Sequence, residues 1–522
     1  MLRKDLKITL LYPPEQNWPD TMCKPNGSLA YPMLAGALRD FGINVQIYDA
    51  CVGGDDKDNL KEIFYKSTEL DNGMLRTGVS DERILEVISD SDAIGLTSIF
   101  SHQETMVLRT AKLIKKHFPK KLILSGGVNA RSRSKKFFEA GIDLICTSES
   151  EKTIIDIAEV LLKNSRDFSH IPQVMFMNGD KEVFTGNKMI MRKGKPATDI
   201  IWDLDELPIP AWDLLPNDRY WEIGRPHGGH FNDDEELKYA SMMTSLGCPF
   251  HCSYCHISGE GLESTAGQIG SYRIKSDDRV LEEMQVLKDL GVRQVFVEDD
   301  SLLGMKKRAI RLVEKIKKFG LEILDVNGVN IIHLLKHNKA EKGEPDYEVL
   351  QLLKDAGFRE IVLPFESATP RIIKKYASSK WNIEQSNMPG LIKACKEVGF
   401  RIAGNFMLGY PDETRNEIMY TIQYAKDRMI DGLDSANFFL VMPLPGTQLF
   451  DEATAKGHLP KDFNPDKMHW QKANMMNTEV PPEELEEIRD KAWQETNKPE
   501  FTNYKKNMRI EDDNTGEIHT KK

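Results

Sequence analysis

The stretch Cys248-Pro-Phe-His-Cys252-Ser-Tyr-Cys255 places three cysteines within eight residues, and the rest of the chain is best interpreted from it. Three thiolates in a C-x3-C-x2-C spacing hold three irons of a 4Fe-4S cluster and leave the fourth iron without a protein ligand. An open iron can bind a substrate, so the cluster can act as a reagent as well as an electron carrier. The alternative is a zinc site completed by His251 or His256. Structural zinc sites usually pair two cysteine knuckles, and the absence of a second C-x2-C favours iron and sulfur.

The composition excludes several classes of protein. The chain of 522 residues is long enough for about two or three domains with cores of their own. Its 70 basic and 81 acidic residues give a formal net charge of −11, which offers no general attraction to nucleic acid or to an anionic membrane. Seven cysteines, three of them clustered, do not indicate a disulfide framework. With no signal-peptide core and no apolar run near ~18 residues, we expect a cytoplasmic protein without a transmembrane segment.

Residues 1–165 alternate short apolar runs with helical patterns. The runs predict strands at residues 7–12, 45–49, 93–98, 122–127 and 144–147. This alternation predicts an α/β fold with a doubly wound, Rossmann-like parallel sheet. Ligands of such sheets bind beyond the carboxyl ends of the strands, and glycines there let a bulky ligand approach the backbone. The residues at these ends are Pro13, Ser98, Gly126, Gly127, Ser148 and Glu149.

A second alternation of strands and helices begins at Tyr239. Its apolar runs predict strands at residues 240–245, 294–297, 322–326, 360–365, 402–407 and 436–441. Parallel barrels carry their chemistry at the C-terminal ends of the strands. The polar residues found at or near those ends include Glu298, Asp299, Glu366, Ser367 and Asn405.

The cysteine spacing, with Tyr254 just before the last cysteine, resembles the signature of the radical S-adenosylmethionine (SAM) enzymes. The resemblance implies that the six strand–helix units form a partial (β/α)6 barrel of the TIM type, and that SAM chelates the open iron. Glu298 or Asp299 resembles the acidic element that holds the SAM amino group, although the more usual Gly-Gly-Glu is absent. Phe365-Glu366-Ser367 resembles the Gly-x-Glu-Ser element, whose glutamate accepts hydrogen bonds from SAM.

Two later strand ends fit the same resemblance. Asn405 lies on the fifth barrel strand, and Gly409-Tyr-Pro-Asp-Glu-Thr414 after it resembles the segment that closes the adenosine side of SAM. Met442-Pro-Leu-Pro-Gly-Thr447 is similar to a Pro-Gly-Thr element of the same family. Glycine, proline and aspartate end strands in many proteins, so each motif alone is weak. Their order along the chain carries the resemblance.

The N-terminal motifs narrow the resemblance to the cobalamin-binding radical SAM enzymes. Pro13-Pro14 follow the first strand, Ser98 the third, the Gly126-Gly127 pair the fourth and the acidic loop at Glu149 the fifth, and the resemblance implies that these strand ends contact cobalamin. Many cobalamin modules carry Asp-x-His-x-x-Gly after the first strand, but no histidine occurs here, so cobalamin would bind without a protein histidine on cobalt. The alternative is a flavodoxin-like domain whose cofactor site has decayed.

The chain also has a proline- and tryptophan-rich bridge. Its segment Trp202–Trp212 resembles the linker of the family and is expected to pack across the domain interface. His227 and His230 of this bridge are candidate ligands, although paired loop histidines are usually structural. The predicted parts are residues 1–165 (cobalamin-binding domain), 166–238 (linker), 239–456 (radical SAM barrel), 457–499 (C-terminal helical region) and 500–522 (mobile polar tail).

The resemblance implies a C-methyltransferase. A radical derived from SAM would abstract hydrogen from an unactivated carbon of a small-molecule or lipid substrate, and methylcobalamin would supply the methyl group. A low-potential donor such as flavodoxin or ferredoxin would supply electrons. The alternatives are a radical cyclase or rearrangement enzyme without methyl transfer, and a non-catalytic iron–sulfur electron-transfer or sensing protein. The polar strand ends argue against a sensor, which needs only the cysteines. No catalytic acid or base is identified.

Overall fold

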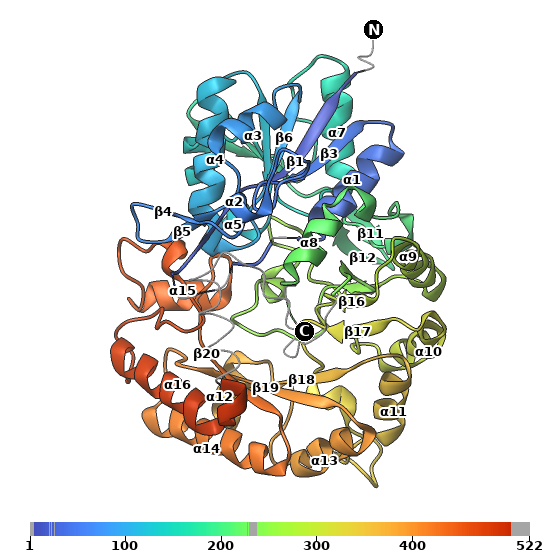
Figure 1. The fold of residues 1–522 in the computed structure, drawn as a ribbon, viewed down its shortest axis with the longest axis vertical. Coiled ribbons are helices and arrows are strands. Elements are labelled where there is room, and N and C mark those ends of the chain that lie inside the picture. Colours follow the sequence, from blue (N-terminus) through green and yellow to red (C-terminus); the bar gives the residue numbers. More distant parts are fainter. Residues whose placement is uncertain are drawn as a thin grey trace.

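The computed structural model describes residues 5–19, 21, 23–25, 27–226, 228 and 237–502. The candidate ligands His227 and His230, and the predicted tail after residue 502, lie outside these residues. Two units of mostly parallel β-structure lie one above the other, with segments of the predicted linker between them (Figure 1). Among the described helices, none combines the length and the apolar character that crossing a membrane requires.

The N-terminal unit is a seven-stranded sheet in the order β10-β9-β8-β7-β6-β1-β3. Its parallel strands are β1 (Lys7–Tyr12), β3 (Asn44–Asp49), β6 (Ala93–Thr97), β7 (Leu122–Gly126) and β8 (Leu144–Cys146). All five predicted strands are present, and the doubly wound fold is confirmed. The sheet continues past residue 165, because the hairpin of β9 (Val174–Asn178) and β10 (Lys181–Phe184) adds antiparallel to β8.

Two layers of helices bury both faces of this sheet, which is why its strands are almost wholly apolar. Helices α1 (Ala30–Asp40) and α7 (Glu151–Leu162) share a core with one face. Helices α3 (Asp81–Val87), α4 (Glu104–His117) and α6 (Ser134–Glu139) share a core with the other. The chain reverses its winding between β1 and β6, which creates the crevice where doubly wound sheets bind ligands.

The C-terminal unit contains two three-stranded parallel sheets. The first holds β13 (Tyr239–Met242), β16 (Gln294–Val297) and β17 (Glu322–Asp325), and the second holds β18 (Glu360–Glu366), β19 (Arg401–Leu408) and β20 (Ser435–Leu440). A parallel bridge between Ile323 and Phe358 links the sheets. The intervening helices are α9 (Asp277–Asp289), α10 (Lys306–Ile316), α11 (Tyr347–Asp355), α13 (Met388–Val398) and α14 (Arg415–Asp431). The expected partial barrel is therefore confirmed.

The free edge of β20 is covered by the C-terminal helix α16 (Pro482–Thr496). The amide of Asn497 binds both backbone groups of Ala436, at 2.8 and 2.7 Å. Arg489 donates from Nε to the carbonyl oxygen of Phe438 at 3.0 Å. Unpaired strand edges attract other strands, so these side chains close the barrel where a further strand would otherwise pair.

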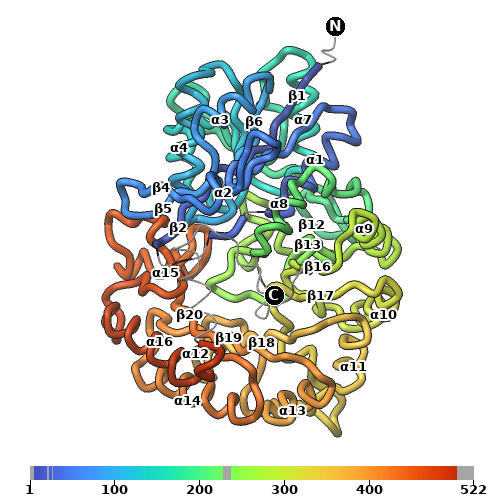
Figure 2. The backbone as a smooth tube through the Cα atoms, in the orientation of Figure 1, coloured from blue at the N-terminus to red at the C-terminus, as the bar shows by residue number. Residues whose placement is uncertain are grey.

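The carboxyl ends of the two parallel sheets face each other, as the smooth tube in Figure 2 allows the reader to follow. Ser148, after β8, donates to the carbonyl oxygen of Ala266 in the barrel unit at 2.8 Å. Arg273 on β15 (Arg273–Ile274) pairs with Glu149 at 2.7 Å, and its five N–H groups all have acceptors. Trp212 of the linker donates from Nε1 to Ser241 at 2.9 Å, so the linker is packed between the units.

We predict that Arg273→Ala lowers the free energy of unfolding by about 3–5 kcal/mol, because the change leaves the largely buried Glu149 side chain, which is 15% exposed, without its cation. Urea denaturation measures the effect. The matched control is Arg39→Ala, whose pair with Asp213 at 2.7 Å is 47% exposed on both sides. Such half-exposed pairs contribute about 0–1 kcal/mol, so equal losses in the two variants would contradict the role given to Arg273.

Candidate functional site

The cysteine loop follows β13 and is fixed by backbone contacts at its start. Strand β14 (Ser245–Leu246) pairs with β15, and the amide of Cys248 donates to Gly270 at 3.1 Å. Gly247 has a φ of +77°, and a Cβ atom there would lie 2.3 Å from the carbonyl oxygen of Ser271. Only glycine suits such a close approach in this conformation. The loop therefore has one defined path from the barrel strand into the three cysteines.

The cysteine thiols of this loop fit a cluster better than a single zinc ion. Sulfur ligands of one tetrahedral zinc lie about 3.8 Å apart, given Zn–S bonds of about 2.3 Å. Cys248, Cys252 and Cys255 are free thiols, and they do not form a set with all ligand atoms within 4.8 Å of one another. Burial raises the pKa of Cys248 and of Cys252 to about 11, and a bound metal centre would favour their thiolate forms.

A polar pocket adjoins Cys248 at the carboxyl ends of β16, β17 and β18. Its polar lining residues are Asp300, Ser301, Asp325, Asn327, Asn330, His333 and Lys380. Several of these groups are buried without a hydrogen-bond partner: both oxygens of Asp325, Oγ of Ser301 and Nδ1 of His333. Buried polar groups are normally paired, so this concentration of unpaired groups fits a ligand with donors and positive charge.

The two acidic residues of the pocket differ from those expected. Burial raises the pKa of Asp300 to about 6, and burial together with nearby Asp299 raises the pKa of Asp325 to about 8. Asp300 stands in the predicted run Glu298-Asp299-Asp300-Ser301, but only the conformation of that turn reveals which carboxylate faces the pocket. Asp325 lies at the end of a predicted strand. Its position at the end of a barrel strand is the feature of the sequence that could have identified it as a site residue.

Asp299, Glu298 and Ser367 do not line this pocket. Asp299 accepts hydrogen bonds at 2.6 Å from the backbone and hydroxyl of Thr244 and from Ser245, so it fixes the turn before the cysteine loop. Glu298 lies near Tyr12 of the N-terminal unit and contributes to raising its pKa. Ser367 is buried 3.2 Å from Thr421 of α14, on the side of the covering helices. The Thr244 contacts explain why Asp300 rather than Asp299 faces the pocket.

Glu366 and Tyr254 meet Lys380 beside the cysteines. Nζ of Lys380 lies 2.7 Å from Glu366 and 5.7 Å from the ring centre of Tyr254. Burial lowers the pKa of Lys380, but Glu366 and Cys252 outweigh it and raise that pKa overall. Glu366 has a φ of +61°, at a register shift in β18. Such a conformation in a residue other than glycine is strained, and strain of this kind concentrates at functional sites.

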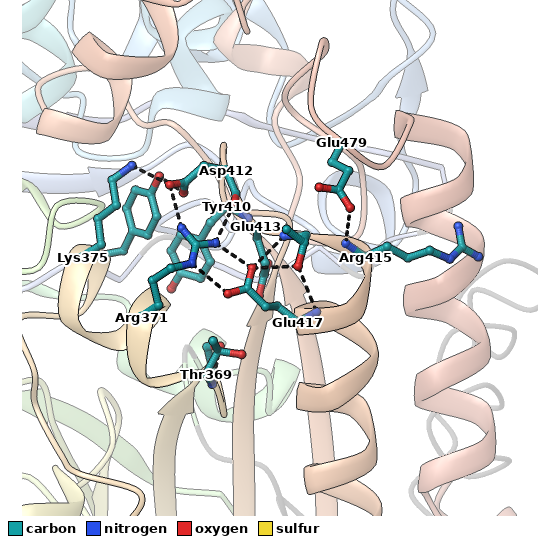
Figure 3. Close-up of polar contacts among 12 residues, drawn as sticks. Thr369, Arg371, Lys375, Tyr410, Asp412, Glu413, Arg415, Glu417 and Glu479 are labelled. Carbon is teal, nitrogen blue, oxygen red and sulfur yellow. Dashed lines mark hydrogen bonds and ion pairs between the residues drawn. The ribbon is translucent and has the colours of Figure 1, made fainter.

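Asn405 lies on β19 and accepts a hydrogen bond from Asn437 of β20 at 3.1 Å. The following loop is locked onto α12 (Pro370–Tyr376), where Arg371 bridges Asp412 and Glu417 (Figure 3). Inside the loop, Glu413 accepts from the backbone N–H of Gly409 at 2.7 Å. The segment that resembles an adenosine-closing element is thus held rigidly at the barrel rim.

The residues predicted to contact cobalamin fall into two groups. Pro13 and Ser98 line a crevice between the ends of β1 and β6, at the reversal of winding. Ser148 and Glu149 are bound to the barrel unit, as described above. Gly127 has a φ of +99°, and a Cβ atom there would lie 2.5 Å from the carbonyl oxygen of Ser98. Gly127 therefore allows the backbone of its own loop to lie close to the backbone of Ser98. A Cβ atom at Gly126 would lie 3.7 Å from the carbonyl oxygen of Cys146, which is an ordinary van der Waals contact.

Comparisons with known proteins agree with this arrangement. The model of the Radical SAM superfamily matches residues 242–425. An uncharacterised methyltransferase of Pyrococcus horikoshii is 30% identical over 320 residues, which span 61% of this chain and 59% of that protein. Cytidylyl-2-hydroxyethylphosphonate methyltransferase of Streptomyces wedmorensis is 25% identical over 481 residues, 87% of this chain and 83% of that protein.

A solved structure shares the fold of both units. It is the radical S-adenosylmethionine methyltransferase TsrM of Kitasatospora setae, determined with cobalamin and a 4Fe-4S cluster bound. The TM-score is 0.61 at 16% identity, over 87% of this chain and 75% of that chain. The similarity therefore extends over more of the chain than the barrel unit alone.

We predict that Asp325→Asn stabilises the cluster-free protein at pH 7. The folded-state pKa of about 8 lies above the ordinary 3.8, so the wild-type chain loses stability as the pH rises from ~4 through ~8. Replacing this group, which must take up a proton on folding at pH 7, should add about 2–4 kcal/mol at pH 7 and nothing near pH 4. Urea midpoints at both pH values test this, with the exposed Asp462→Asn as the control. An unchanged midpoint at pH 7 would contradict it.

Proposed function

Because residues 242–425 match the model of the Radical SAM superfamily, we propose that the chain is a cobalamin-dependent radical SAM methyltransferase acting on an unactivated carbon of a small molecule. The observation that carries the proposal is the pocket beside Cys248, where buried polar groups without partners adjoin three free thiols. This end of the barrel faces the carboxyl ends of a doubly wound sheet. The names of the Streptomyces relative and of the matched structure both support methyl transfer as the reaction.

The residues fit the cofactors in the following way. When bound, the cluster and SAM supply radical chemistry, and cobalamin supplies the methyl group. Cys248, Cys252 and Cys255 would hold the cluster. Asp300 and Asp325 would accept hydrogen bonds from the SAM amino group, a cation for which one partly buried and one buried carboxylate are suited. Pro13, Ser98 and Gly126 would lie against cobalamin at the crevice of the N-terminal sheet.

The remaining polar residues orient the ligands and exclude water. Lys380 holds the buried Glu366 carboxylate at 2.7 Å, where its oxygens could also accept hydrogen bonds from the ribose hydroxyls of SAM. The ring of Tyr410 stacks on Tyr376 at 4.7 Å and closes the rim on the side of the loop after β19. The packed N-terminal unit covers the rim opposite, which keeps the reacting carbon away from bulk solvent.

The proposal includes an electron donor and a cellular location. The reaction consumes electrons that the chain does not itself supply, so a low-potential protein such as a flavodoxin or a ferredoxin would deliver them to the cluster. Free thiols at all seven cysteines suit the reducing cytoplasm.

We predict that anaerobically reconstituted protein binds about four irons per chain through the three clustered cysteines. Cys248→Ala, Cys252→Ala and Cys255→Ala should each lose the brown absorbance of the cluster and the cleavage of SAM. Iron analysis and absorbance spectra measure this. Cys395→Ala is the matched control, because Cys395 is also a buried free thiol but lies in the barrel core. Stoichiometric zinc without iron in anaerobically isolated protein would exclude the cluster.

Methyl transfer has its own signature. The protein should take up one cobalamin per chain, and an accepted substrate should yield S-adenosylhomocysteine and 5'-deoxyadenosine in about equal amounts, because one SAM supplies the methyl group and another the radical. Cytidylyl-2-hydroxyethylphosphonate is the first substrate to test, given the relative in Streptomyces. Product analysis by mass spectrometry measures the ratio. Deoxyadenosine alone would indicate cyclisation or rearrangement, and no uptake of cobalamin would exclude the proposed reaction.

A further inference from the structure

A second group of metal-binding side chains lies far from the cysteine loop in the sequence, at one edge of the N-terminal sheet. Glu15, Cys23 and Cys51 each place one ligand atom within 4.8 Å of the other two. Within the described part of the chain, this is the only set of three histidine, cysteine or carboxylate ligands so close together. The group supplies no ligand to the proposed cluster, and the inference does not rest on the function proposed above.

The topology of the sheet brings these residues together. β1 and β3 pair in parallel with Tyr12 opposite Asp49, so the segments that follow them start side by side. Cys51 comes directly after β3, and its neighbour Ala50 donates its backbone N–H to Tyr12 at 2.9 Å. Glu15 opens β2 (Glu15–Asn17), which pairs with β5 (Leu75–Thr77). The next segment then returns Cys23 to the same place.

The geometry of the two thiols matches one tetrahedral ion. Their sulfur atoms lie 3.9 Å apart. Two sulfur ligands of a tetrahedral zinc lie about 3.8 Å apart, given Zn–S bonds of about 2.3 Å. Thiolates are poor ligands for Mg²⁺ and Ca²⁺, whereas two thiolates and one carboxylate suit Zn²⁺. We propose that Glu15, Cys23 and Cys51 form a zinc site.

The surroundings suit a bound cation. Cys51 is fully buried and Glu15 is 6% exposed, and no salt bridge between Glu15 and a cation is found among the described residues. Two thiolates, one carboxylate and Zn²⁺ leave one negative charge, and Nη1 of Arg225 lies 3.5 Å from the carbonyl oxygen of Cys23. A buried cluster of acidic ligands is costly unless a cation pairs with it.

The neighbouring carboxylate Asp49 is already used by the protein. It accepts the backbone N–H of Cys51 at 2.8 Å and the hydroxyl of Tyr220 at 2.7 Å. Asp49 therefore orients the segment that carries Cys51, in the way that groups behind metal ligands commonly do. The three ligands leave a fourth tetrahedral position for water or another group.

The ion would fix the loop after β1. Glu15 belongs both to this group and to the lining of the crevice between β1 and β6. A zinc ion would tie that loop to the end of β3 and so define one wall of the crevice. Because its ligands come from separate segments, the ion would also stabilise the folded chain.

The test is metal analysis of the cluster-loaded protein purified without chelators. Zinc bound here should amount to one ion per chain, in addition to the iron of the cluster. Cys51→Ser and Glu15→Gln should each weaken zinc affinity by more than about 100-fold. This loss exceeds the usual effect of replacing a residue that only hydrogen-bonds to a metal ligand. Cys146→Ser is the matched control, because Cys146 is a buried free thiol of the same sheet but lies at the end of β8. It should keep the zinc.

A second measurement does not depend on variants that must fold. In the wild-type protein, alkylation of Cys23 and Cys51, mapped by mass spectrometry, should be slow and should accelerate at least tenfold when a chelator removes zinc. Three results would overturn the proposal. They are a Cys23–Cys51 disulfide in freshly isolated protein, free thiols that are alkylated at the same rate with and without the chelator, and a zinc content that is equal in Cys51→Ser and wild type.

Discussion

The ion pair between Arg273 and Glu149 holds the carboxyl ends of two parallel sheets against each other, and the proposed chemistry depends on that arrangement. A buried guanidinium is tolerable only when its donors are satisfied, and here all five are. Three of its five acceptors are backbone carbonyl oxygens from the loop after the cysteines (Ile269, Ser271) and from the linker (Ile201), so Arg273 also fixes the strand β15 against which the cysteine loop is built. The N-terminal unit thus contributes to the shape of the cluster site without supplying a ligand to it.

The pocket beside Cys248 is built at a cost in stability. Asp325 and His333 have buried polar atoms without hydrogen-bond partners. Burial raises the pKa of Asp325 to about 8 and lowers the pKa of His333 to about 4, so it favours the neutral form of both side chains. Lys380 and Glu366, in contrast, neutralise each other at 2.7 Å. A ligand that carries both an ammonium and a carboxylate can pair with each kind of group in turn. Pairing these buried atoms with a ligand would add to the binding free energy and so stabilise the folded chain.

The sequence predicts the fold well because the signals are periodic and local. Every parallel strand of the core follows an apolar run, since both faces of each strand are covered. The sequence does not reveal which of two neighbouring side chains faces a pocket. Asp299 and Asp300 are identical neighbours, yet Thr244 and Ser245 bind the first, and the second faces the pocket. Lys380 carried no motif, and only the fold brings it beside Glu366.

Residues at strand ends are ambiguous for the same physical reason. Ser148 and Glu149 stand where a doubly wound sheet binds ligands, but a second sheet facing that edge competes for the same hydrogen bonds. Glu15, Cys23 and Cys51 are dispersed along the sequence and have no recognisable spacing, so only the pairing of β1 with β3 reveals them as a group. Spacing identifies metal ligands carried by one loop, whereas ligands carried by several segments must be found in the folded chain.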